Sequence, residues 1–241
     1  MAQAILITSG KGGTGKSVVC AGLGEALVRQ GKKVLLLEGS HRSLDVLFDV
    51  ADSIVFDFSD IVDQNCELTD AMVEIGETGL LKLICAPVAQ TVPVDADLCR
   101  DFVETVEPYF DYILIEVDGL DAMTLSAYAS AVSRAVLVCT PDRISARTAR
   151  VVSDALFAEN VPDIRLCVNN LPREFERQRQ IPDLDWLIDN VCAQLIAVLP
   201  YDRSVYSASI GHSINLSNVS KMIFDNFAQR ILGNYIDLLI E

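Results

Sequence analysis

The residues best suited to chemistry lie near the start of the chain, in the segment Gly10-Lys11-Gly12-Gly13-Thr14-Gly15-Lys16-Ser17. This segment matches the pattern Gly-x-x-x-x-Gly-Lys-Ser, in which backbone N–H groups surround the phosphates of a nucleotide. Glycines permit the dihedral angles that turn successive N–H groups inward, and the N-terminus of a following helix adds a partial positive charge. Lys16 is expected to reach the β- and γ-phosphates, and the Ser17 hydroxyl to bind Mg²⁺.

Such a loop needs a buried strand before it and a helix after it, and the hydrophobic pattern predicts both. Seven short runs, rich in leucine or β-branched residues, predict strands buried on both faces, because none alternates with polar residues. Strands that alternate with helices predict an α/β fold, a doubly wound, mostly parallel sheet with helices on both faces. The strands are expected at 4–9, 33–37, 80–85, 112–115, 135–139, 164–168 and 195–199, and helices at 17–30, 96–106 and 146–157.

Composition and charge limit the classes of function. Of 241 residues, 51% are apolar, which supports a large buried core, and we expect one domain over residues 1–241. The 19 Lys and Arg against 34 Asp and Glu give a net charge of −15, which disfavours non-specific binding to nucleic acid or anionic lipid. There is no run of 18 uncharged apolar residues and no basic leader, so we expect a cytoplasmic protein.

Cysteine and histidine usage gives no sign of a metal centre. The seven cysteines are scattered without a Cys-x-x-Cys pair, and His41 and His212 stand alone. This pattern is typical of small buried apolar side chains in a reducing compartment. We therefore assign no ligand role to these residues.

Lys11 is a second lysine within the loop, which the general pattern does not require. With it, residues 9–17 resemble the deviant Walker A sequence of the MinD/ParA family of P-loop ATPases, closest to its MinD-like members. In that family the signature lysine crosses a dimer interface and contacts the nucleotide of the partner subunit. The resemblance implies ATP and Mg²⁺ as ligands and an ATP-dependent homodimer.

Further segments resemble the same family in the same order over residues 2–215. Residues 35–38 resemble its second strand and residues 112–116 its Walker B strand. Asn169 resembles a strand-end asparagine that contacts adenine, while Pro200 and Asp202 resemble a Pro-x-Asp segment beside the base. The nucleotide-binding residues that the resemblance implies are Gly10, Lys11, Gly12, Gly13, Thr14, Gly15, Lys16, Ser17, Val18, Asn169, Pro200 and Asp202.

Three positions depart from the family pattern, and all concern hydrolysis. The family normally has Asp where this chain has Glu38 and Glu116, and a further Asp that positions the attacking water where it has Ser40. Glu38 and Glu116 are one methylene longer than Asp, which shifts a carboxylate that Mg²⁺ requires in near-ideal octahedral geometry. The Ser40 hydroxyl lacks the negative charge with which a carboxylate would act on the attacking water. We therefore predict very slow or absent ATP hydrolysis. The catalytic set is Lys11, Lys16, Glu38, Ser40 and Glu116, and the metal ligands are Ser17, Glu38 and Glu116.

Two further segments bear on partners. Residues 219–241 have helical periodicity but a net charge of about −1, so packing on the domain or a partner is favoured over direct membrane anchoring. Arg143, Arg147 and Arg150 form a stripe at helical spacing that could receive an acidic partner or nucleic acid, although local salt bridges are the favoured interpretation. Residues 172–185 are expected to form an exposed excursion.

The leading interpretation is a MinD-like switch that dimerises with ATP, recruits an unidentified protein partner and helps to position a cell structure such as the division site. A ParA-like DNA-partitioning ATPase is an alternative, which the acidic charge weakens. A metal-inserting or biosynthetic P-loop enzyme is another. Unpaired cysteines argue against metal insertion, and the lack of an extra substrate domain argues against biosynthetic chemistry.

Overall fold

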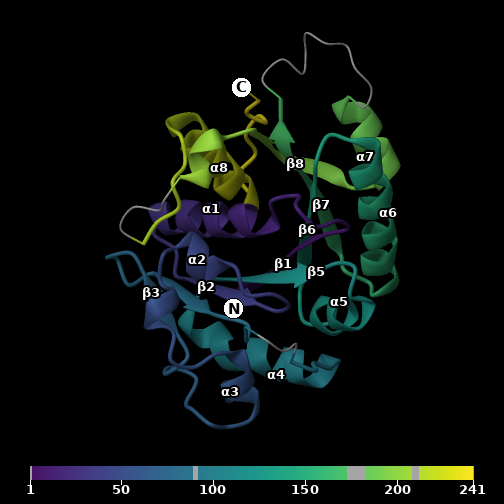
Figure 1. Cartoon of the computed structure of the whole chain (residues 1–241). Coiled ribbons are helices and arrows are strands. Elements are labelled where there is room, and N and C mark those ends of the chain that lie inside the picture. Colours follow the sequence, from purple (N-terminus) through teal and green to yellow (C-terminus); the bar gives the residue numbers. More distant parts are fainter. Residues whose placement is uncertain (1, 89–91, 173–182, 208–211, 241) are drawn as a thin grey trace.

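A computed structural model describes residues 2–88, 92–172, 183–207 and 212–240 (Figure 1). Its centre is an eight-stranded sheet in the order β3-β4-β2-β5-β1-β6-β7-β8. Neighbouring strands are parallel except β3 and β4, which are antiparallel. The strands are β1 (Gln3–Ser9), β2 (Val34–Glu38), β3 (Val73–Ile75), β4 (Leu81–Ile84), β5 (Tyr112–Asp118), β6 (Arg134–Cys139), β7 (Asp163–Leu171) and β8 (Gln194–Pro200).

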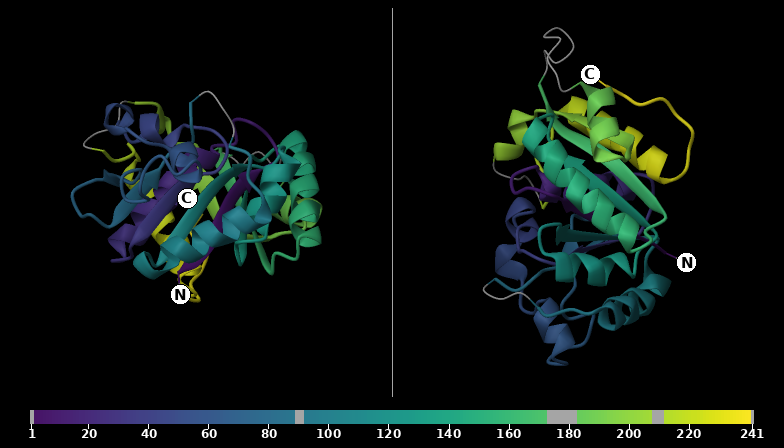
Figure 2. Two further views of the ribbon diagram at one scale, coloured as in Figure 1. Left: turned by 90° about the horizontal axis from the view of Figure 1, so that it is seen from below. Right: turned by 90° about the vertical axis from the view of Figure 1, so that its right-hand side faces the viewer.

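Helices cover both faces of this sheet (Figures 1 and 2). One face carries α1 (Lys16–Arg29), α2 (Leu44–Leu47) and α8 (Asn218–Ile231). The other carries α3 (Phe58–Val62), α4 (Ala96–Val106), α5 (Ala122–Ala129), α6 (Arg143–Ala158) and α7 (Leu184–Val191). Short 3₁₀ turns span Ala51–Ser53, Glu107–Tyr109 and Arg203–Tyr206.

The predicted α/β architecture is confirmed, because each of the seven expected strands and three expected helices has a counterpart. The strand pattern has a simple cause in β1, where Leu6 packs under the α4–α7 layer while Ile5 and Ile7 pack under α1 and α8. Because both faces of the sheet are buried, apolar and polar residues do not alternate along the strand. The antiparallel β3 was not predicted, since three residues are too few to show a period.

Two expectations need correction: the length of the C-terminal helix and the burial of all the cysteines. The helix expected over 219–241 ends at Ile231, because Gly233 adopts a left-handed conformation with φ 85° that closes the helix. Five cysteines are buried as expected, but Cys66 is half-buried and Cys192 is exposed. Within the described residues, no helix combines the length and apolar character needed to cross a bilayer.

The carboxyl ends of the central strands meet at one edge of the sheet. In the parallel register, Ser9 of β1 lies opposite Asp118 of β5, and Glu38 of β2 lies opposite Glu116 of β5. The glycine-rich loop leaves β1 at this edge and enters α1. In open α/β sheets, ligands bind outside the carboxyl ends of the strands. The predicted site residues are therefore gathered where such a fold binds its ligand.

Candidate functional site

The loop between β1 and α1 presents backbone rather than side chains. Gly13 and Gly15 have φ values of 78° and 86°, which residues with a Cβ rarely adopt. A Cβ at Gly10 would overlap the backbone at Thr148, and a Cβ at Gly15 would overlap the Asn169 amide. No side chain caps the N-terminus of α1 at Gly15. The first N–H groups of α1 are thus available to an anion.

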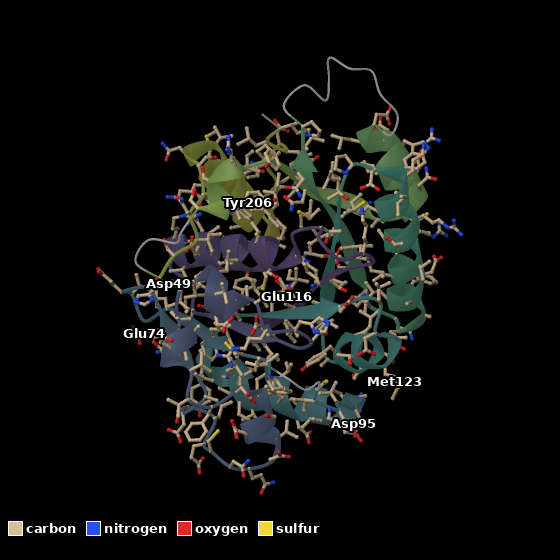
Figure 3. The ribbon with its side chains drawn as sticks, in the orientation of Figure 1. Asp49, Glu74, Asp95, Glu116, Met123 and Tyr206 are labelled. Atoms are coloured by element: carbon tan, nitrogen blue, oxygen red, sulfur yellow. The ribbon has the colours of Figure 1, made fainter. Side chains whose placement is uncertain are left out.

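Lys16 and Ser17 share one carboxylate oxygen at the mouth of this loop. The Lys16 Nζ donates to Glu116 Oε1 at 3.1 Å, and the Ser17 Oγ donates to the same oxygen at 2.7 Å. Glu116 is only 4% exposed, and its other oxygen, Oε2, is buried with no hydrogen-bond partner among the described residues. Figure 3 shows Glu116 near the centre of the molecule.

This arrangement fits a divalent cation by the chemistry of its donors. The Ser17 hydroxyl and the Glu116 carboxylate are hard oxygen ligands within hydrogen-bond distance of each other, and Mg²⁺ commonly takes only one or two protein ligands and fills its other positions with phosphate and water. The unpartnered Oε2 supplies a lone pair that the protein itself does not use. The metal-binding roles of Ser17 and Glu116 stay predictions.

Glu38 is fully buried and anchors the segment that follows β2. Its Oε1 accepts the backbone N–H groups of Ser43 at 2.5 Å and Leu44 at 2.6 Å, and its Oε2 accepts that of Ala86 at 3.2 Å. Burial raises the pKa of Glu38 to about 7, although the backbone hydrogen bonds act in the opposite direction; the charge of Glu116 adds to the rise. Both oxygens are therefore engaged by the backbone, and a metal-binding role for Glu38 stays a prediction.

Ser40 and Lys11 each contact an aspartate of another element. The Ser40 Oγ accepts the Asp118 N–H at 2.9 Å, which ties the end of β2 to the end of β5. The Lys11 Nζ lies 3.6 Å from a carboxylate oxygen of Asp142, the N-cap of α6, and both side chains are about two-fifths exposed. Lys11 is thus at the surface, in contrast to Lys16, which points inward.

Beside the loop lies a cavity of about 250 Å³. Predicted nucleotide-binding residues line this cavity from separate elements. Val18 comes from α1, and the residues predicted to lie beside the base, Asn169, Pro200 and Asp202, come from β7, β8 and the turn after β8. The Asn169 Nδ2 donates to the carbonyl of Thr14 at 2.8 Å, which fixes the amide against the loop. The cavity is of the size and position expected for a base, although the residues' roles in binding stay predictions.

Asp202 is held in its ionised form. Burial acts to raise its pKa, but hydrogen bonds from Ser220, Ser217 and Ser204 outweigh this and lower the pKa to about 2. The Ser204 N–H donates to Oδ1 at 2.9 Å and the Ser217 N–H to Oδ2 at 2.8 Å. Asp202 therefore joins the end of β8 to the start of α8.

Sequence reasoning missed most of the apolar wall of the cavity. It is formed by Leu199, Val205, Tyr206, Leu216 and Phe224. Tyr206, labelled in Figure 3, lies beside α8. These residues carry no motif, and Phe224 reaches the wall because α8 packs on α1, where its ring would overlap a Cβ placed at Gly22. For Phe224 the signal in the sequence was Gly22, one of two glycines within α1, which allows this close packing.

The arginine stripe lies on the exposed side of α6. Arg150 pairs with Asp154 at 2.8 Å, but among the described residues neither Arg143 nor Arg147 has a carboxylate within 4.0 Å. The expectation of local salt bridges thus holds for Arg150 alone. Of the predicted excursion at 172–185, residues 173–182 lie outside the described part of the chain.

A mostly parallel sheet, a glycine-rich loop at its carboxyl edge and a base-sized cavity beside that loop define a P-loop nucleotide-binding protein. The chain belongs to the CobQ/CobB/MinD/ParA nucleotide-binding domain family, whose sequence profile matches residues 5–215. This confirms the resemblance drawn from the loop and the segments that follow it.

Individual relatives carry the same family name. A septum site-determining protein MinD from Synechocystis sp. is 33% identical over 249 residues, covering 99% of this chain and 92% of that protein. A septum site-determining protein MinD from Bacillus subtilis is 30% identical over 249 residues, covering 100% and 92%. Among solved structures, the MinC:MinD cell division protein complex of Aquifex aeolicus superposes with a TM-score of 0.88 at 25% identity, covering 99% of each chain.

Proposed function

We propose that this protein is a MinD-like nucleotide switch that binds ATP as one domain over residues 1–241, dimerises and helps to position the division site. The observation that carries the proposal is the placement of two lysines in one loop, with Lys16 against the Ser17–Glu116 pair and Lys11 at the surface. The first suits a phosphate bound within the chain, and the second suits a nucleotide bound by a facing copy. The names of the Synechocystis and Bacillus relatives support the cellular role.

Nucleotide binding is assigned to the loop and the neighbouring cavity. The N–H groups from Gly10 to Val18 would hold the phosphates, and Asn169, Pro200 and Asp202 would flank the base. Bound Mg²⁺ would neutralise phosphate charge at Ser17 and Glu116. Because Lys16 donates to Glu116, phosphate binding requires its ammonium group to turn from that carboxylate or to be shared with it.

Slow hydrolysis follows from the groups at the strand ends. The Ser40 hydroxyl is engaged by the Asp118 N–H and carries no charge to activate a water. Glu38 accepts three backbone N–H groups, so its carboxylate holds residues 43–44 and Ala86 in place. A nucleotide that binds well and turns over slowly would keep a dimer together, which is what a recruiting switch needs.

A protein partner is part of the proposal, since the Aquifex relative is seen in a complex of MinC with MinD. We expect a cytoplasmic location without direct membrane anchoring through α8, because Ile223, Phe224 and Phe227 of that helix are buried in the core against α1. The net charge of −15 disfavours a nucleic-acid partner.

Size-exclusion chromatography with light scattering tests the proposal, run with Mg²⁺ and ATP, ADP or no nucleotide. We expect a dimer with ATP only, and a monomer that still binds ATP for Lys11→Ala. Calorimetric titration with ATP gives the affinity in each case. A chain without affinity for ATP in Mg²⁺ contradicts nucleotide binding, while a Lys11→Ala dimer contradicts the assigned role of Lys11 alone.

A further inference from the structure

We infer that the groove between α6 and α7 is a docking surface for an acidic segment of a partner protein, one that also carries an apolar side chain. The inference gives the chemistry of the partner in the proposed function and rests on that function for its biological use. Its physical basis lies outside the nucleotide site.

The groove is built from two helices that lie side by side (Figures 1 and 2). It has a volume of about 740 Å³ and contains all three residues of the arginine stripe. They share the groove with Val151 on α6 and with Trp186 and Asn190 on α7. A basic row and an apolar wall therefore face the same space.

Two of the three arginines that line the groove have no ion pair among the described residues. Arg143 and Arg147 are exposed and have no ion pair among the described residues, while Arg150 has Asp154. Arginine binds carboxylates in a bidentate manner and is less strongly hydrated than lysine, which suits it to interfaces. Two uncompensated guanidinium groups thus favour an anionic occupant.

A strongly acidic region of the molecule lies away from this groove. Between residues 43 and 81 there are ten Asp and Glu and no Lys, Arg or His. That region includes α2, α3 and β3, which lie on the opposite side of the molecule from α6 and α7 in Figure 1. An acidic segment is repelled there and attracted at the groove, so charge complementarity sets its orientation.

Trp186 and Val151 supply the apolar part of the surface. Trp186 is half-buried, and Val151 is 65% exposed, although it lies on a helix packed against the core. Tryptophan and arginine are the residues enriched at energetically dominant interface positions. A leucine or phenylalanine beside the acids of a partner would cover this wall. Nucleic acid has no such aliphatic group, which favours a protein occupant.

Helix α6 also contacts the glycine-rich loop of residues 10–17. The backbone of α6 at Thr148 lies so close to Gly10 that no Cβ would fit between them, and Asp142, the N-cap of α6, contacts Lys11. A partner held on α6 would therefore share this helix with the loop that binds nucleotide.

Trp186 is the single tryptophan of the chain, so its fluorescence reports on this groove. The probe is a 16-residue helical peptide with glutamates at i, i+4 and i+7, the spacing of the three arginines, and leucines beside them. Titrated without nucleotide, it should shift Trp186 emission in a saturable way. A peptide of the same composition in scrambled order should bind at least 10-fold more weakly.

Variants separate the groove from general charge effects. Arg143→Glu/Arg147→Glu should weaken peptide binding at least 10-fold, and the neutral Arg143→Gln/Arg147→Gln gives the same direction if the reversal harms folding. Arg100→Glu on α4, also exposed but paired with Asp97, is a charge-reversal control outside the groove and should leave binding unchanged. The inference is overturned by no saturable shift up to 1 mM peptide, by equal loss in the control, or by tighter binding of a 20-base-pair duplex or of phosphatidylglycerol vesicles. Because ATP is absent, a failure of nucleotide binding leaves this result unaffected.

Discussion

The phosphate loop and the acidic strand ends form two halves of one site, and their polar groups are used differently. In the loop, the groups that face the ligand are backbone N–H groups, left free by the glycines and the uncapped start of α1. At the strand ends, Glu38, Ser40 and Glu116 are each engaged by another part of the protein. The loop is prepared for an added ligand, whereas the strand ends are satisfied without one except at Glu116 Oε2, which has no partner among the described residues.

The difference teaches that binding and turnover depend on separate features. Binding rests on backbone geometry, which survives changes of side chain provided that the glycines remain. Turnover rests on the type and length of a few side chains, which single substitutions alter. A chain of this family can therefore keep the first and lose the second, and substitutions in each half should have distinct effects.

The largest effect is expected from Lys16→Ala, which removes the inward charge of the loop. ATP affinity should fall on the order of 100-fold, since a charge-assisted contact to phosphate is lost. Isothermal titration with ATP and Mg²⁺ measures this. Lys11→Ala is the matched control, because its ammonium group lies at the surface beside Asp142, and monomer affinity should change little. Equal losses in both variants would contradict the distinction between the two lysines.

Gly10→Ala tests whether the loop depends on backbone approach. The added Cβ would overlap the α6 backbone at Thr148, which cannot rotate away, so unfolding free energy should drop by about 2 kcal/mol or more. Chemical denaturation gives the value. Gly12→Ala is the control, because no atom lies within 4 Å of a Cβ placed there, and its stability should stay near that of the native chain. A destabilised Gly12→Ala would point to a loop conformation different from the one described.

In the other half of the site, Ser40→Asp should restore part of the missing carboxylate. ATP turnover should rise about 10-fold, less than the roughly 100-fold or more that general acid–base catalysis typically contributes, because Asp118 lies close by and opposes the added charge. Phosphate release at saturating ATP measures the rate. Ser40→Ala should leave turnover unchanged, and adding Lys16→Ala to Ser40→Asp should abolish it. A native rate already as fast as that of Ser40→Asp would refute the proposed defect.

The sequence predicted the fold and the loop well, because both depend on local signals. Strands buried on both faces give continuous apolar runs, and glycine spacing marks the turn from β1 to α1. Contacts between distant segments could not be predicted from such local signals. Glu38 accepts an N–H group from Ala86, 48 residues away, and Phe224 reaches the base cavity only because α8 packs on α1. Such contacts depend on tertiary packing, which no local pattern encodes.

Asp202→Asn gives the smallest expected effect and tests whether the base cavity is held by a carboxylate. A folded-state pKa of about 2, below the ordinary value of 3.8, means that ionised Asp202 stabilises the fold above pH 3.8 and that this contribution is lost as pH falls through 2. After allowance for partial solvent exposure, it amounts to about 1 kcal/mol. Urea unfolding at pH 6 should therefore show Asp202→Asn less stable than the native chain by this amount, and the gap should narrow at pH 3. Asp101→Asn, on the exposed side of α4, should show no gap at either pH. If the difference in unfolding free energy between Asp202→Asn and the native chain stayed constant with pH, the side chain would act by packing. The contact between β8 and α8 would then not depend on the charge of Asp202.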